Sequence, residues 1–401
     1  MTQLKEDNIN VISAETSTKL DIDGISKTYE VFKIKLNLLY YNDKNDRIGT
    51  WVSQYKAEHG DLDVTSENYN EIIHDFIKKS NPSAMDKTIK NIRAVNQRVP
   101  GVVLRDGRII DGNRRFTSLR ELSKEDPKFS YFEAVILDHD YTKDNTAIKE
   151  LELKLQHGVD EKVDYDPIER LVGIYNDIVE GPLTIERYAS CTNEKPKEVS
   201  KNVEIAKYMV EFLQFINAPK QFHIARNLDL NGPLHELYGA ISKETDEDRK
   251  ETIKKAFFAN LIMRPSGDMT RYVRQIKNMM SDEEISQEYL DDQEDKISDL
   301  IDLIDEAVTD EQPLTQKVIS EKIQSNEGLK DRLKISVENS YSKYTAKENK
   351  NEPLKLLKDA NTKLDGVDIN ILKMLKDDKI EEVKNILNEI EGKISDIKER
   401  L

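Results

Sequence analysis

One stretch in the first third of the chain, residues 98–122, limits what this protein can fold into. It contains two short apolar runs, 101–104 and 108–111. They are joined by Asp106-Gly107, and Asp-Gly between apolar runs is a strong hairpin signal, because glycine tolerates the positive φ of a type I′ turn. From Asn113 onward apolar residues recur three apart, which is typical of a helix. The stretch therefore predicts a strand, a tight turn, a second strand and a helix.

The junction between the second strand and this helix has the composition of an anion-binding site. Asp111 and Gly112 end the strand, and Asn113, Arg114 and Arg115 begin the helix. The N-terminus of a helix offers N–H groups and a partial positive charge, and arginine binds phosphate through two parallel hydrogen bonds. From the spacing alone, a simple turn followed by a solvated helix face is an equally good interpretation.

This junction, Asp111-Gly112-Asn113-Arg114-Arg115, resembles the signature box of the ParB/sulfiredoxin-like superfamily. In ParB proteins the box usually reads Gly-Glu-Arg-Arg, and its loop holds the phosphates of a nucleotide. Asn45-Asp46-Arg47 is similar to the earlier Asn-Pro-Arg box, and Gln156 falls where the third box has its glutamine. The resemblance spans roughly residues 30–215. It implies that CTP or ATP is bound by Asn45, Arg47, Asp111, Gly112, Asn113, Arg114, Arg115 and Gln156.

The third box departs from the family pattern, which is usually Glu-Asn-x-Gln-Arg. In nucleotide-hydrolysing members the Glu and Asn hold magnesium, but alignment on Gln156 places Leu153 and Lys154 at those positions. Leucine cannot ligate a metal, and lysine brings positive charge to the place of the cation. We therefore expect nucleotide binding and leave open whether Mg²⁺ takes part, whether Glu150 or Glu152 replaces the missing ligand, and whether the chain is a weak nucleoside triphosphatase. No metal ligand or catalytic residue is assigned, and His157 is the histidine considered for catalysis.

Residues 184–206 predict two helices joined by a short turn. The pattern resembles the helix-turn-helix with which ParB proteins read the major groove, and it implies that Lys197, Ser200 and Lys201 face DNA. Residues 184–216 hold five acidic and five basic side chains, so the region is neutral. A helix pair that serves only as a packing element is therefore the alternative.

The net charge of −16 is unevenly distributed along the 401 residues. Residues 281–312 hold fourteen acidic side chains and one basic one, whereas residues 86–120 hold nine basic and three acidic ones. A basic patch thus remains for phosphate despite the global excess of acid. The single cysteine, Cys191, excludes an intrachain disulfide framework and is expected to be a small buried side chain. No apolar run is long enough to cross a membrane and no signal peptide is visible, so we expect a cytoplasmic protein that can associate with the nucleoid.

Three regions are expected. Residues 1–145 form an α+β ParB/sulfiredoxin-like domain with a loose arm over residues 1–25. Residues 146–280 form a helical domain that contains the helix-turn-helix, and residues 281–401 form an acidic helical region. In its last turns, apolar residues recur three and four apart from Ile380 to Leu401, which fits a coiled-coil seam or the edge of a bundle. ParB proteins dimerise through their C-terminal segments, so the resemblance implies a homodimer, with a protein partner on these helices as the other option.

The leading hypothesis is a ParB-like DNA-associated protein that binds CTP or ATP through the Asp111–Arg115 loop. One alternative is an enzyme on the same fold, namely a nucleotide hydrolase, a small-molecule kinase or a nuclease. Another is a nucleotide-free adaptor in a mobile-element or phage-defence system. Salt-dependent DNA binding separates the first hypothesis from the adaptor, and metal-dependent turnover identifies the enzyme.

Overall fold

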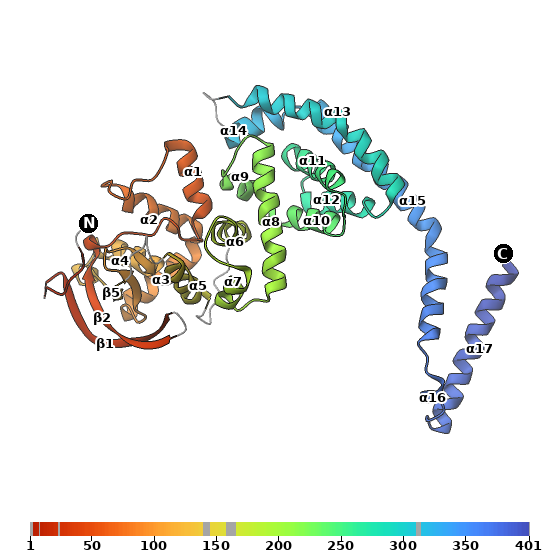
Figure 1. Cartoon of the computed structure of the whole chain (residues 1–401), viewed down its shortest axis with the longest axis horizontal. Coiled ribbons are helices and arrows are strands. Elements are labelled where there is room, and N and C mark those ends of the chain that lie inside the picture. Colours follow the sequence, from red (N-terminus) through yellow and green to blue (C-terminus); the bar gives the residue numbers. More distant parts are fainter. Residues whose placement is uncertain are drawn as a thin grey trace. The chain divides into compact units, whose positions relative to one another are not determined.

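A computed structural model describes residues 3–7, 9–22, 25–138, 145–157, 166–309 and 314–400. The chain divides into two compact units, Met1–Ser340 and Tyr341–Leu401. The first unit opens with a five-stranded sheet and its helices and continues with helices alone, so the predicted fold class, an α+β domain followed by helices, is confirmed (Figure 1).

The sheet has the order β1-β2-β5-β3-β4. Its strands are β1 (Val11–Ile22), β2 (Ile25–Lys35), β3 (Gly101–Leu104), β4 (Ile109–Asp111) and β5 (Tyr131–Leu137). β3 and β5 run parallel, and all other neighbours are antiparallel. The parallel pair needs a crossover connection, and the helix that begins after β4 supplies it.

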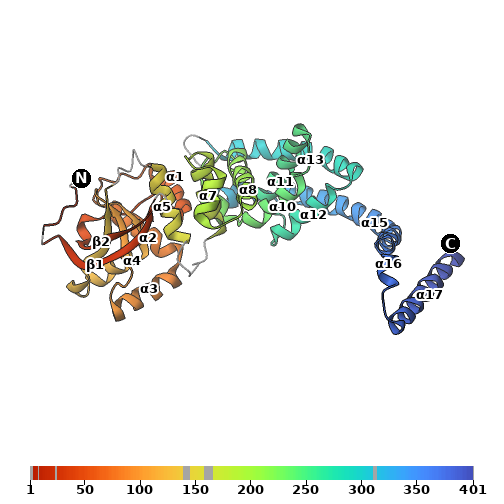
Figure 2. The same cartoon turned by 60° about the horizontal axis from the view of Figure 1, so that its bottom comes forward.

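Helices cover both faces of this sheet. They are α1 (Gly49–His59), α2 (Tyr69–Ser80), α3 (Pro82–Val95), α4 (Asn113–Ser123) and α5 (Asn145–His157), with the 3-10 turns η1 (Leu36–Leu38) and η2 (Pro127–Phe129). Alternate residues of β5 show the division: Phe132 and Ala134 pack into the core shared with α1–α4, whereas Val135 and Leu137 pack with α5. Figure 2 shows the sheet and these helices from a second side. The inner strand β3 is apolar on both faces because both of its faces are buried.

The N-terminus differs from its prediction. A loose arm was expected over residues 1–25, but Val11–Ile22 form β1, which pairs along its length with β2. Leu4 and Val11 are buried in the core on the α1–α4 side. The segment can be polar because only three of its twelve side chains, those of Val11, Leu20 and Ile22, are buried, while its backbone completes the sheet at one edge.

The turn between β3 and β4 is also of a different type from the one predicted. Gly107 has a φ of +94°, but Asp106 is not among the residues with positive φ, so the turn is not type I′. The amide of Gly107 donates to the carbonyl of Leu104 at 3.0 Å, and the amide of Leu104 donates to the carbonyl of Arg108 at 2.8 Å. This is a β-turn closed by a left-handed glycine, the three-residue form of hairpin.

The remainder of the first unit is helical. Its elements are α6 (Pro167–Ile174), the π-helical turn η3 (Tyr175–Val179), α7 (Ile185–Thr192), α8 (Pro196–Phe215), α9 (Phe222–Asn227), α10 (Asn231–Ile241), α11 (Glu247–Met263), α12 (Met269–Met279), α13 (Glu283–Ala307), α14 (Gln316–Val318), the π-helical turn η4 (Ile319–Ile323) and the first part of α15 (Glu327–Asp365). Cys191 is buried in α7 as expected. Among the described residues, no helix is both long enough and apolar enough to span a membrane.

The second unit consists of the rest of α15 with α16 (Ile369–Leu372) and α17 (Asp377–Arg400). None of its described side chains is buried. Large apolar side chains of α17 are exposed, including Ile386 at 50% and Ile394 at 42%. A helix of this kind gains its stability from whatever covers its apolar face, because propensity alone is insufficient.

The sheet domain and the helices that follow are joined at α1. The carboxylate of Glu169 on α6 accepts hydrogen bonds from both the amide and the hydroxyl of Thr50, near the start of α1. Arg226 on α9 donates to the Thr50 hydroxyl at 2.7 Å, and its guanidinium lies 3.9 Å from the ring centroid of Trp51. A cation over an indole face is a favourable contact, so α1 is held to two helices of the helical part.

Candidate functional site

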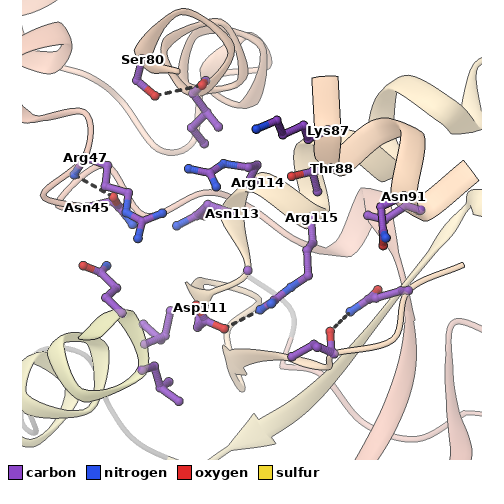
Figure 3. A pocket seen from close by; sticks show the side chains of 18 of the residues that line it. Asn45, Arg47, Ser80, Lys87, Thr88, Asn91, Asp111, Asn113, Arg114 and Arg115 are labelled. Atoms are coloured by element: carbon purple, nitrogen blue, oxygen red, sulfur yellow. Dashed lines mark hydrogen bonds and ion pairs between the residues drawn. The ribbon is translucent and has the colours of Figure 1, made fainter. Parts of the chain in front are cut away.

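A cavity of about 510 Å³ opens where α2, α3, α4 and the end of α5 meet the loop before α1. All eight residues that the sequence predicts for nucleotide binding line it, as the close view in Figure 3 shows for six of them by label. The other lining residues are Ile48, Ile77, Ser80, Lys87, Thr88, Asn91, Ile92, Gln97, Arg98, Val99, Ile110 and Leu155. Residues far apart in the sequence thus converge on one cavity.

The start of α4 forms one wall of this cavity. Gly112 has a φ of +100°, a conformation that side-chain-bearing residues rarely adopt. A Cβ atom at this position would lie 2.8 Å from Cζ of Phe132, so glycine is also required for space. Gly112 has no side chain that could cap the helix. The first N–H groups of α4 can therefore donate hydrogen bonds to a ligand at this wall of the cavity.

The two arginines of the signature box have different environments. The guanidinium of Arg115 donates to Oδ2 of Asp111 at 2.5 Å and approaches the carbonyl of Pro100 at 3.5 Å. Arg115 therefore fixes the strand-to-helix junction. Arg114 instead extends across the cavity toward the side of Asn45 and Arg47 (Figure 3). Of the pair, Arg114 is the one placed to contact a ligand.

The loop before α1 forms the opposite wall. Asn45 is buried, and its Oδ1 accepts a hydrogen bond from the amide of Arg47 at 2.9 Å. Its carbonyl accepts from the amide of Ile48 at 3.1 Å. Asn45 therefore holds the turn that directs Arg47 toward the cavity, which explains why asparagine fits here although the next residue is Asp46 rather than proline.

Two cations of the cavity were not predicted. Lys87 lies on α3 and Arg98 lies in the loop after it, and both belong to the lining. A signal for the α3 wall was present, because Lys87, Thr88 and Asn91 occupy one helical face beside the buried Met85 and Ile92. Together the described lining residues include five cations and a single carboxylate, that of Asp111, so the cavity favours an anion with several charges.

A buried cluster of charged side chains joins the loop before α1, α5 and η3. Nζ of Lys149 lies 2.8 Å from Oδ1 of Asp46, 3.2 Å from Oδ1 of Asp177 and 3.6 Å from Oε2 of Glu152. Burial raises the pKa of Glu152 to about 7 and raises the pKa of Asp177 well above its usual range. Lys149 lowers both values but does not offset the burial.

The third-box positions do not fit a magnesium ion. Leu153 is fully buried, and Lys154 is outside the lining of the cavity. Of the two carboxylates that might replace the missing ligand, Glu152 faces Lys149 and Glu150 pairs with Arg187 at 3.3 Å. The side chain of His157 lies outside the part of the chain that the structure describes.

The predicted helix-turn-helix corresponds to α7 and α8. Thr184 caps α7 by accepting a hydrogen bond from the amide of Arg187, and Asn193 makes the turn with a φ of +55°. Lys197 and Ser200 are exposed near the start of α8, whereas Lys201 is half-buried with its ammonium 5.6 Å from the ring centroid of Tyr238. The three residues predicted to face DNA therefore do not share one environment.

No family model matches the chain. No curated protein sequence matches it either. The chain is similar to a solved structure of a Pnob8-like ParB-N domain, with 14% identity and a TM-score of 0.28, over 61% of this chain and 95% of that one.

Proposed function

We propose that the chain is a ParB-like DNA-associated protein whose cavity binds a nucleoside triphosphate, CTP or ATP. The observation that carries the proposal is the convergence of Arg47, Lys87, Arg98 and Arg114 with the uncapped start of α4 on one cavity. A triphosphate carries three to four negative charges, and these groups supply a comparable positive charge. Apolar lining residues such as Ile110 and Leu155 offer a surface for a nucleoside.

Calorimetry on the full chain tests this proposal. CTP, ATP, GTP and UTP are titrated with and without magnesium into the wild type, into Arg114→Ala and into Arg105→Ala. Arg105 is the matched control, because it pairs with Asp138 at 2.9 Å in the neighbouring hairpin and is outside the cavity lining. Binding that Arg114→Ala abolishes and Arg105→Ala preserves supports the proposal. A wild-type protein that binds none of the four nucleotides contradicts it.

We further propose that α7 and α8 contact DNA, with Lys197 and Ser200 as the residues nearest to it. Their exposure at the start of a helix that follows a capped helix and a short turn supports this role. Electrophoretic mobility shifts at several salt concentrations test it, since phosphate contacts make affinity fall with salt. Binding that does not respond to Lys197→Ala would favour the packing role.

Self-association through α17 is the third part of the proposal. The exposed apolar residues of this helix include Leu387, Ile394 and Ile397, at 50%, 42% and 43% exposure. They are spaced seven and three apart, which places them on one face of the helix and suits a helix–helix seam. Sedimentation equilibrium of the wild type and of Ile394→Asp measures it, and a wild type that stays monomeric at high concentration contradicts it.

A further inference from the structure

The Lys149 cluster brings together four charged side chains from three parts of the chain. Asp46 comes from the loop before α1, Lys149 and Glu152 from α5, and Asp177 from η3. The side chains are 7%, 12%, 2% and 5% exposed, respectively. Water cannot solvate charges at such a buried site. The negative charges of the cluster must therefore be neutralised by positive charges or protons within the cluster itself.

The cluster is not electrically neutral if all four side chains are ionised. One ammonium faces three carboxylates, which leaves two negative charges in excess. Oδ2 of Asp177 is buried and has no hydrogen-bond partner among the described residues. Burial raises the pKa of both Glu152 and Asp177, so the cluster retains protons near neutral pH.

Other charged or titratable groups around the cluster do not supply the missing positive charge. Asp111 on β4 adds negative charge toward Glu152, and its own carboxylate is engaged by Arg115. Tyr188 on α7 faces Asp46 and Asp177, which raises the pKa of its hydroxyl further. On the α6 side Gly173 lies against Asp46, where a Cβ would come within 2.9 Å of the carboxyl carbon. Protons are therefore the adjustable charge of this cluster.

The cluster is directly connected to the cavity. Gln156 lines the cavity, and its Nε2 donates to Oε1 of Glu152 at 3.2 Å. Asp46 stands between Asn45 and Arg47, which both line the cavity. Only one residue, such as Gln156, would thus separate a polyanion in the cavity from the carboxyl groups of the cluster. These carboxyl groups already outnumber the single ammonium of Lys149 by three to one.

We propose that a polyphosphate entering the cavity drives proton uptake by the Glu152 and Asp177 carboxyls, so that occupancy of the site depends on pH. This inference rests on the proposed nucleotide binding. The bound negative charge disfavours the ionised carboxylates, so the complex holds more protons than the free protein. Affinity then falls as pH rises, by up to about tenfold per pH unit for each proton taken up.

Calorimetry in buffers with different enthalpies of ionisation measures the uptake. ATP and CTP are titrated at one pH near 7.5 into the full-length wild type and into Glu152→Gln, and the buffer dependence of the heat gives the number of protons bound. Ionisation of the nucleotide itself is common to both proteins and cancels in the difference. We expect the wild type to take up more protons per bound nucleotide than Glu152→Gln, and its dissociation constant to rise more steeply with pH.

Glu150→Gln is the matched control, because Glu150 lies on the same helix but pairs with Arg187 outside the cluster. Asp177→Asn gives a second test if Glu152→Gln does not fold. Nucleotide binding with the same proton uptake in the wild type and in the cluster variants would overturn the inference and leave the proposed function intact. A wild type that binds no nucleotide at all would remove both.

Discussion

The cavity and the helix-turn-helix are expected from the same family resemblance, yet they distribute their charge differently. In the cavity, five cations face one carboxylate, which Arg115 already holds. At the start of α8, Lys197 stands next to Glu198, and the ammonium of Lys201 rests on Tyr238. The comparison shows an excess of cations among the described lining residues of the first region, and only a few exposed polar side chains without such an excess in the second.

The largest effect that would break this comparison is expected at Gly112. In Gly112→Ala the new Cβ meets Phe132 and the residue must keep a φ of +100°. Strain of this kind costs on the order of 1–3 kcal/mol of folding free energy, and a shifted α4 start should abolish nucleotide binding. Urea denaturation and calorimetry measure the two effects. Gly267→Ala is the control, because a Cβ there has no atom within 4 Å and should change neither quantity.

The contact between Glu169 on α6 and Thr50 on α1 predicts that the folding stability depends on pH, with an effect of similar size. Burial raises the pKa of Glu169 to about 7, although Thr50 and Arg226 lower it. The folded state therefore keeps a proton that the unfolded chain loses above about pH 4.5, so this group's contribution to stability falls as pH rises from about 4.5 to about 7 and is constant above that. The contribution at stake is on the order of 2–3 kcal/mol.

Urea denaturation between pH 5 and 8 checks this effect in the wild type and in Glu169→Gln. The variant should show a smaller loss of stability across that range. Glu152 and Asp177 act in the same direction, so some loss remains in the variant. Identical pH profiles of the two proteins would mean that Glu169 is ionised in the folded state.

The contrast between the two arginines of the signature box can be sharpened next. Arg114→Ala should weaken nucleotide binding by roughly 10- to 100-fold, because a charge-assisted contact with the ligand is worth about 1.5–3 kcal/mol. Arg115→Ala should weaken binding and also lower the unfolding free energy, since it leaves Asp111 without its partner. Calorimetry and denaturation on both variants separate the roles, and equal stability losses would show that the roles are not distinct.

The smallest effect is expected at the helix-turn-helix. Lys197→Ala should weaken DNA binding a few-fold and reduce the slope of log affinity against log salt by about one, as for a single lost phosphate contact. Lys207→Ala is the matched control, because Lys207 lies on the same helix and pairs with Glu204 at 2.8 Å. A change in slope for Lys207→Ala as large as that for Lys197→Ala would place DNA elsewhere.

Sequence patterns predicted well what depends on local spacing. The strand at 101–104 and the helix from Asn113 were placed correctly, because apolar periodicity and the Gly112 junction are short-range signals. β1 was missed because only Val11, Leu20 and Ile22 of its twelve residues are buried, so the segment lacks the regular apolar alternation of a strand. The helix α1 was not anticipated either. Two of its three buried residues, Thr50 and Ser53, are polar and form hydrogen bonds with the distant α6 and α9.

For the site, the resemblance located residues that local chemistry alone could not bring together. Asn45 and Gln156 are distant from the Asp111–Arg115 loop in sequence, yet all of them line one cavity. Lys87 and Arg98 were missed because a basic residue on an amphipathic helix or loop is usually a solvated one. The Lys149 cluster was also not predicted, since Lys149 and Asp177 resemble ordinary surface charges in the sequence and only the fold buries them.

The contact between Trp51 and Arg226 provides an intrinsic fluorescence probe. Trp51 is the single tryptophan of the chain, so its emission comes from one place, where α1 leaves the cavity loop and meets α9. A guanidinium over the indole face alters the excited state, and any shift of α1 against α9 changes that overlap. Tryptophan fluorescence of the unmodified protein can therefore report in real time whether a ligand in the cavity changes the contact between α1 and α9.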